Sequence, residues 1–305
     1  MNDTDLLHEL APEAERLLER HLSASKEWFP HHLVPWDRAA RSDPRDPWDV
    51  EAHPMDEAVR QALFLNLLTE DNLPYYTSKI DRMFGVDDPW GAWNRRWTAE
   101  EGRHSIVIRD YLTLSGAVDP VALERARMKQ MSHGFHQPIA NVFEVLVYVA
   151  LQELATRISH RNTGKLLAEH DPAGYEVMAR VAADENLHYL FYRDASTAAV
   201  ALDPSSMVLA MERQVRVFEM PGAGVQGFGE MAKSIARAGI YDLTIHHDQI
   251  LVPVIMRHWR LESLEGLSPE AEQARGRLVE RIAKIDRVGR RLSAKREEAT
   301  AGAVS

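Results

Sequence analysis

The chain has 305 residues, of which 45% are hydrophobic and 27% charged, and its formal net charge is −10. This composition describes one globular domain with a large core, which we expect to cover residues 1–305 with flexible ends at about 1–4 and 298–305. The negative charge argues against nucleic-acid binding, and the absence of cysteine excludes disulfides, a thiolate nucleophile and an iron–sulfur cluster of the chain's own.

Hydrophobic periodicity and turn chemistry predict an almost entirely helical chain, with no β-hairpin pattern. Pro, Gly and Asp residues mark the breaks between helices, as in the loop 37–53 and the turn 220–224. In chain order, the expected helices cover about 5–26, 55–83, 90–115, 120–132, 138–160, 172–201, 205–218, 227–238, 242–261 and 269–296.

The N-terminal segment is acidic and amphipathic, and no run reaches the ~18 uncharged apolar residues of a spanning helix. We therefore expect a cytoplasmic protein without a transmembrane segment. The segment 275–298 holds nine Arg or Lys against four Asp or Glu. It is either a basic helix that attracts an acidic partner or an ordinary solvated C-terminal helix.

One metal-ligand spacing occurs twice along the chain. A single Glu is followed, 31 or 32 residues later, by a Glu and a His in the pattern ExxH. A Glu and a His three apart lie on one helix face, so each pair can bind one ion, and the two single glutamates complete a cage of four carboxylates and two imidazoles. The six residues are Glu70, Glu101 and His104 in the first copy and Glu153, Glu185 and His188 in the second.

The ligand types narrow the choice of metal. Oxygen-rich ligation with one imidazole per ion suits iron or manganese, whereas zinc sites usually take sulfur or more histidines. Two divalent ions would neutralise the four carboxylates, which would otherwise be costly to bury. A single ExxH is more often a solvated helix face, but two copies at matching distances favour the metal site.

Segments around these positions carry a more specific pattern. They read TEDNLPYY at 69–76, WTAEEGRH at 97–104, ATRISHRNT at 155–163 and AADENLH at 182–188, with YLTLSG at 111–116 and LEGLS at 264–268 outside the metal site. Over about residues 28–291 the chain resembles the soluble acyl-[acyl-carrier-protein] desaturases, the type 2 fatty acid desaturases. A ferritin or a ribonucleotide reductase radical subunit would share the ligands but not these flanks.

The resemblance implies an all-α, ferritin-like di-iron four-helix bundle extended by additional helices. It implies that O2 and two external electrons introduce a cis double bond into a fatty acyl chain on acyl carrier protein. Two Fe per subunit would be bridged by Glu101 and Glu185, with Glu70 and His104 on one ion and Glu153 and His188 on the other. A ferredoxin-type donor and a homodimer are also implied, and the missing transit peptide is typical of bacterial, here actinobacterial, members.

Three further residues are candidates for supporting roles. Thr156 lies three residues after Glu153 on the same helix face, so its hydroxyl can bond either an oxygen species at the metals or its own helix backbone. The resemblance implies that Asp184 pairs with a histidine ligand and with a tryptophan where electrons enter. Trp28 fits that tryptophan, or else anchors a helix end. The runs 142–151 and 250–259 line a substrate channel or belong to the bundle core.

Two other functions are compatible with the same cage. A di-metal oxidase or hydroxylase acting on another apolar substrate would give an oxygenated product. A non-catalytic protein that binds acyl carrier protein or stores metal would give no product.

Overall fold

The computed structural model describes residues 1–41, 47–52, 54–135, 137–219 and 221–304, and throughout these ranges it contains helices and connecting loops without strands. This confirms the all-α prediction. The α-helices are α1 (Asp3–Ala24), α2 (Pro30–Leu33), α3 (Glu57–Glu70), α4 (Leu73–Phe84), α5 (Pro89–Leu114), α6 (Pro120–His133), α7 (Val142–Leu167), α8 (Pro172–Leu202), α9 (Pro204–Val217), α10 (Phe228–Arg237), α11 (Leu243–His246) and α12 (Pro269–Val304). Short 3₁₀ segments are η1 (Trp36–Arg41), η2 (Val50–Ala52), η3 (Pro221–Gly224) and η5 (Leu261–Ser263), and η4 (His247–His258) is a π-helix.

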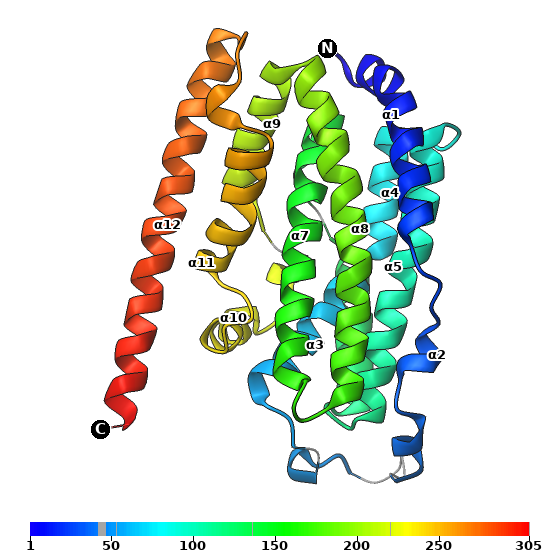
Figure 1. Ribbon diagram of the computed structural model, residues 1–305. Coiled ribbons are helices and arrows are strands. Elements are labelled where there is room, and N and C mark those ends of the chain that lie inside the picture. Colours follow the sequence, from blue (N-terminus) through cyan, green and yellow to red (C-terminus); the bar gives the residue numbers. More distant parts are fainter. Residues whose placement is uncertain (42–46, 53, 136, 220, 305) are drawn as a thin grey trace.

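Four long helices form the central bundle. α7 packs most extensively against α8, α3 contacts both α5 and α7, and α5 contacts α8 (Figure 1). α1 covers α5 and α8 on one side, whereas α9 packs against α7 and carries α12 on the other side. α7 is buried on most faces, and its first part, residues 142–151, is apolar except for Glu144 rather than amphipathic.

Four helices begin with the same N-terminal cap. An Asp side chain accepts hydrogen bonds from the first free backbone N–H groups, and a proline follows it directly at the start of α5, α6, α8 and α9. An acidic cap satisfies orphan N–H groups, and proline needs no hydrogen bond at the first helical position. These starts agree closely with the predicted ones.

The predicted helix 55–83 is wrong in one respect, because the chain breaks at Asp71 and Asn72. Arg127 of α6 donates to both carboxylate oxygens of Asp71, at 2.7 and 2.9 Å, and Gln130 donates to the side chain of Asn72. These distant partners stabilise the break, which local helix propensity does not show. As a result α3 ends on Glu70, and α4 starts in a new direction.

The C-terminal third also differs in detail from the prediction. The expected helix 242–261 is a short α11 followed by the π-helix η4, in which Trp259 N–H bonds to Val254 O five residues earlier. Wider π turns accommodate an extra residue within a helix. α1 begins at Asp3 and α12 continues to Val304, so helix extends into both ends of the chain.

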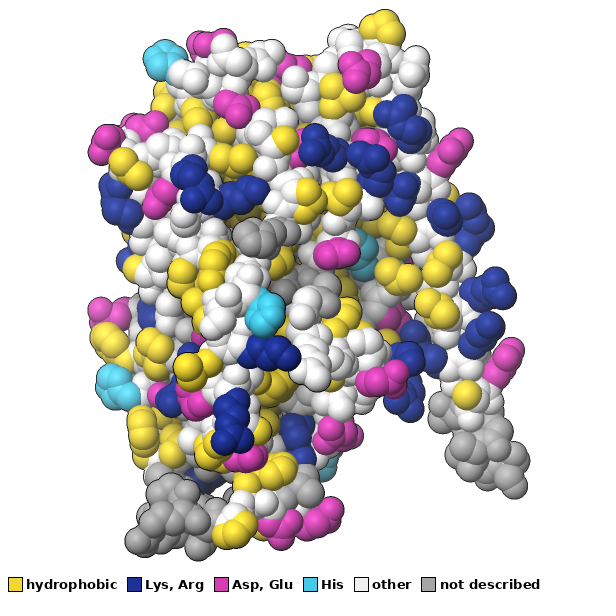
Figure 2. Space-filling model, turned by 180° about the vertical axis from the view of Figure 1, so that it is seen from behind, with side chains coloured by type: hydrophobic (Ala, Val, Ile, Leu, Met, Phe, Trp, Pro, Cys, Tyr) yellow, Lys and Arg dark blue, Asp and Glu magenta, His cyan; other side chains and the backbone are white. Residues whose placement is uncertain are grey.

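α12 carries the basic segment identified in the sequence. Figure 2, which views the molecule from behind, shows Lys and Arg side chains along this helix at the edge of the body. In the described ranges, no helix combines the length and the apolar composition needed to cross a bilayer.

We expect Gly91→Ala to lower the free energy of unfolding by about 2–3 kcal/mol. Gly91 is buried in the first turn of α5, and an added Cβ would lie 2.3 Å from the carbonyl carbon and oxygen of Val86. Backbone atoms cannot rotate away from this clash. Urea unfolding measures the loss.

Gly276→Ala is the matched control. This glycine is exposed on α12 and has no atom within 4 Å of an added Cβ. Alanine is the better helix former, so this change should raise stability by about 0.5–1 kcal/mol. Equal changes in the free energy of unfolding for Gly91→Ala and Gly276→Ala would contradict the expected clash with the Val86 backbone.

Candidate metal centre

The structure brings all six predicted ligand residues together inside the bundle. Glu70 comes from α3, Glu153 from α7, and the two ExxH pairs from α5 and α8. Their ligand atoms form two groups, each within 4.8 Å: Glu70, Glu101, His104 and Glu185, and Glu101, Glu153, Glu185 and His188. Glu101 and Glu185 belong to both groups, which is the placement that bridging ligands require.

Both imidazoles of the cage place the same ring nitrogen, Nδ1, next to the cage carboxylates. His104 Nδ1 lies 3.4 Å from a Glu101 oxygen and 3.6 Å from a Glu185 oxygen, and His188 Nδ1 lies 2.8 Å from Glu101. Their Nε2 atoms point outward, towards Asp184 and Glu100 respectively. Each ring therefore offers Nδ1 to the cage and keeps Nε2 for a supporting carboxylate.

Several buried atoms of the cage have no hydrogen-bond partner outside it among the described residues. They are Nδ1 of His104 and one oxygen each of Glu153 and Glu185, whereas Nδ1 of His188 and one oxygen of Glu101 face each other at 2.8 Å. Buried polar atoms without partners are costly, and these point into one small space. Their chemistry, oxygen-rich with one imidazole per group, fits two divalent ions of the iron or manganese type.

Glu153 and Glu185 hold charge differently although both are buried. Burial raises the pKa of Glu153 well above the usual value, and the negative charge of Glu185 acts in the same direction. Burial would also raise the pKa of Glu185, but hydrogen bonds from Glu153, His160 and His188 outweigh it and lower this pKa. In the metal-free protein the pair therefore keeps a proton on Glu153 and a charge on Glu185.

Metal binding is expected to release about two protons per chain or more at pH 7. Burial alone would lower the pKa values of His104 and His188, but the surrounding carboxylates outweigh it and raise both well above the usual value. Both rings are then protonated without metal, and only a neutral ring binds an ion. Because protons compete less at higher pH, apparent affinity should rise from about pH 6 to pH 8. Anaerobic ferrous titration with a pH indicator measures the release, and a pH-independent affinity would contradict the prediction.

Trp28 and Asp184 contact each other and His104, the arrangement that the family resemblance implies, while their role in electron entry stays a prediction. The indole Nε1 of Trp28 donates to Asp184 Oδ2 at 2.7 Å, and Asp184 lies 3.6 Å from His104 Nε2. Trp28 also stacks on His104, with ring centroids 6.4 Å apart and planes 15° apart. The guanidinium groups of Arg103 and Arg180 lie over the indole ring, and both also donate to the Asp184 carboxylate.

The hydroxyl of Thr156 bonds its own helix backbone, which is the second of the two alternatives predicted for it. It is buried near the cage, but its hydroxyl donates to the carbonyl oxygens of Gln152 and Glu153, both at 3.1 Å. This is the backbone bonding typical of helix threonines. A role toward oxygen stays a prediction and would require a rotation of the hydroxyl.

The sequence reasoning missed four buried residues around the cage. Glu100 bonds His188 Nε2 and His21, Trp97 Nε1 donates to Glu153 at 3.0 Å, and His160 Nε2 lies 3.2 Å from Glu70. One signal was available: Glu100 precedes Glu101 just as Asp184 precedes Glu185, so the repeated unit is an acid followed by ExxH. His21 and Trp97 carried no comparable spacing.

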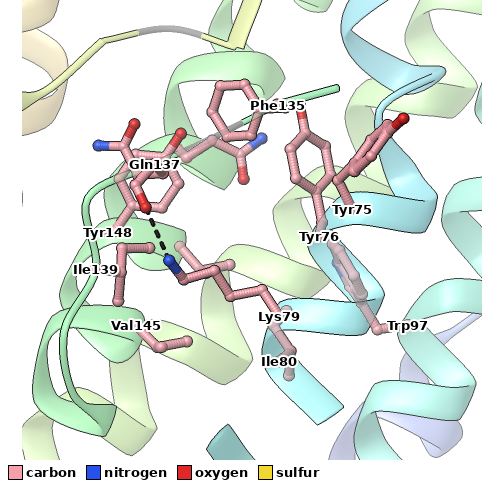
Figure 3. Close-up of a pocket in the computed structure, with 12 residues that line it drawn as sticks. Tyr75, Tyr76, Lys79, Ile80, Trp97, Phe135, Gln137, Ile139, Val145 and Tyr148 are labelled. Carbon is pink, nitrogen blue, oxygen red and sulfur yellow. Dashed lines mark hydrogen bonds between the residues drawn. The ribbon is translucent and has the colours of Figure 1, made fainter. Parts of the chain in front are cut away.

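An apolar pocket lies next to the cage (Figure 3). Trp97 lines it and also bonds Glu153, while Gln152 lines it one residue before that ligand. The remaining wall includes Ile80, Phe135, Ile139, Val145, Tyr148 and Val149, so part of the run 142–151 faces this pocket. Ile250, Leu251, Val254 and Ile255 of η4 are instead buried in the main core.

The pocket wall also carries the charged side chain of Lys79 from α4. Its amine donates to the backbone oxygen of Gln137 at 2.8 Å (Figure 3). Gln137 belongs to the loop that follows α6 and also lines the pocket. Partial burial lowers the pKa of this amine. The pocket therefore presents a mainly apolar wall between the cage and Lys79.

Comparison with known proteins gives consistent matches over nearly the whole chain. The profile of the fatty acid desaturase family matches residues 2–305. DesA1 of Mycobacterium tuberculosis, named as an acyl-[acyl-carrier-protein] desaturase, is 41% identical over 294 residues, covering 92% of this chain and 85% of that protein. A chloroplastic, seed-specific stearoyl-[acyl-carrier-protein] 9-desaturase of Brassica napus is 28% identical over 315 residues, covering 95% and 77%.

A solved structure matches the fold as well. The crystal structure of DesA2 from Mycobacterium tuberculosis H37Rv, titled as an acyl-ACP desaturase, superposes with a TM-score of 0.69 at 26% identity. The match covers 88% of this chain and 99% of that chain. It confirms the predicted ferritin-like helical fold, and the mycobacterial relatives agree with the predicted actinobacterial character.

Proposed function

The chain belongs to the fatty acid desaturase family and is an acyl-[acyl-carrier-protein] desaturase, and we propose that it works with two iron ions held by the six cage residues. Bound iron would supply O2 activation and hydrogen removal from unactivated carbon, which side chains alone do not provide. The product is a cis double bond, and O2 is the co-substrate.

One observation carries the metal assignment. Glu101 and Glu185 each lie in both ligand groups, and several buried ligand atoms of the cage have no hydrogen-bond partner outside it among the described residues. A merely structural carboxylate cluster would be expected to satisfy these atoms with hydrogen bonds. The cage would therefore be costly to maintain unless it served to bind metal.

We further propose that the acyl chain lies in the pocket beside the cage. Its wall is mainly apolar and aromatic, and Trp97 and Gln152 place it directly against Glu153. Such walls exclude water and fix an alkyl chain by contact rather than by hydrogen bonds. The residues of this chain thus hold the substrate in place and keep water from the ions.

Electrons must come from another protein, because the chain has no cysteine for a cluster of its own. We propose a ferredoxin-type donor that docks beside Trp28, where Arg103 and Arg180 supply positive charge. We also propose a homodimer in the cytoplasm, an assignment that rests on the family resemblance.

Trp28→Phe is expected to lower turnover with a ferredoxin donor by about 10–100-fold. The substitution keeps a ring on His104 but removes the indole N–H that bonds Asp184. Arg103 and Arg180 still donate to this carboxylate. Single turnover of chemically reduced protein should change far less. Trp48→Phe is the control, since this exposed indole donates to the Gly116 carbonyl and lies under Arg60. Equal effects of the two substitutions would argue against the electron path.

Anaerobic ferrous reconstitution followed by a single turnover tests the proposed function. Stearoyl-acyl carrier protein, reductant and O2 are added, and both iron content and acyl products are measured. Two irons per chain with a cis-monounsaturated product is the expected result. A hydroxylated product would favour the oxidase or hydroxylase alternative, and failure to retain iron would overturn the metal assignment. Zinc-loaded protein is the redox-inert control.

A further inference from the structure

The two cage histidines are supported from outside in different ways. His104 is supported by Asp184 and an indole, whereas His188 is supported by Glu100 and a second imidazole. Glu100 Oε2 lies 3.0 Å from His188 Nε2 and 2.7 Å from His21 Nε2. The exposed fractions of His21, Glu100 and His188 are 4%, 3% and 0%, so this chain of three side chains is shielded from water.

We propose that His21 is a positioning residue for His188. It acts through Glu100 and sets how tightly the protein holds the ion bound by Glu153 and His188, while the ion at Glu70 and His104 is independent of it. This inference rests on the proposed two-metal centre. It assigns a role in metal binding to α1, a helix that contributes no ligand.

The arginines near Glu100 are more exposed than His21. Arg96 contacts Glu100 at 2.5 Å and Arg103 lies 3.9 Å away, but their side chains are 39% and 22% exposed, so solvent screens both ion pairs. The bond to His21 is fully buried and is not screened. Burial would raise the pKa of Glu100, but the bonds from His188 and His21 outweigh it and keep the carboxylate ionised. A charged acceptor on Nε2 then leaves Nδ1 of His188 free for the ion.

The rings fix His21 as firmly as its hydrogen bond does. Its ring is stacked over that of His188, with centroids 5.8 Å apart and planes 19° apart. Trp93 packs edge-on against His21 at 5.0 Å. A side chain held on one face by the ligand itself and on its edge by an indole has little freedom to leave Glu100.

α1 places His21 through its own apolar face. Leu6, Leu10, Ala14 and Leu17 are buried at intervals of three or four residues, and His21 continues this face in the last turn. The helix contacts both α5, which carries Glu100, and α8, which carries His188. The packing of α1 therefore places His21 against Glu100, and through Glu100 against His188.

Titration with Co²⁺, a spectroscopic stand-in for Fe²⁺, tests the inference on the full chain. Wild-type protein should bind two ions tightly. His21→Leu should retain one ion at wild-type affinity and bind the second about 10–100-fold more weakly, with a changed visible spectrum. His21→Gln keeps an N–H at the tip of a similar side chain and should recover most of the loss. Circular dichroism and thermal unfolding establish that each variant is folded.

A second background identifies the ion affected. In Glu153→Ala protein, which already lacks a ligand of that site, His21→Leu should leave the remaining ion unchanged. If His21→Leu does not fold, Glu100→Gln carries the same expectation. Two ions bound at wild-type affinity by folded His21→Leu protein would overturn the inference alone. Failure of the wild-type protein to bind two ions would overturn the proposed function, and the inference with it.

Discussion

Glu185→Ala is expected to lose both metal ions and to lower desaturation by at least about a thousand-fold. Its carboxylate belongs to both ligand groups and lies 3.6 Å from His104 Nδ1 and 3.7 Å from His188 Nδ1. No neighbouring side chain can replace it, because the other carboxylates of the cage are already in use. Iron per chain and acyl products after reconstitution measure the two losses.

Glu176→Ala is the control for this substitution. Glu176 lies on the same helix, α8, but is exposed to solvent. It should keep two irons and wild-type turnover. Retention of both irons by Glu185→Ala would show that this carboxylate does not bridge the ions.

Glu153→Gln should abolish desaturation but leave the metal-free fold within about 1 kcal/mol of wild type. Its raised pKa means that Glu153 is already neutral without metal, and glutamine has nearly the same shape. Trp97 can still donate to the remaining oxygen. A neutral amide is a poor ligand for the ions, so activity is lost without a loss of stability. Urea unfolding of metal-free protein measures the stability.

Glu185→Gln is the matched comparison within the same pair. Glu185 carries the charge that His160 and His188 contact, so its removal leaves buried cations without their partner. The metal-free fold should lose about 3–5 kcal/mol. An equal loss in the free energy of unfolding for Glu153→Gln and Glu185→Gln would show that the proton of the metal-free pair does not reside on Glu153.

The six cage positions could be predicted because each follows from a local rule. The pattern ExxH places a Glu and a His on one helix face. Each ExxH follows a single Glu, 31 residues later in the first copy and 32 in the second, and this repeat identifies the two remaining ligands. The structure places all six in one space, although metal binding itself remains a prediction. Helix starts were equally local, since an Asp cap followed by proline is written in the sequence.

The features that were missed depend on contacts across the fold. The break after Glu70 is held by Arg127, 56 residues from Asp71. His21 meets Glu100 from 79 residues away, and its spacing to any ligand follows no helical period. The π-helix η4 requires a register that apolar periodicity does not distinguish from an α-helix.

The acids that precede the two glutamates shared by both ligand groups each support the histidine of the other helix. Glu100 of α5 bonds the histidine of α8, while Asp184 of α8 faces the histidine of α5. To build this site into another helical bundle, α5 and α8 would have to be transferred together. With α5 alone, His104 would lack Asp184 and Glu100 would lack His188, and α8 alone would have the converse defect. The smallest transferable site therefore contains both helices, the indole of Trp28 and the imidazole of His21.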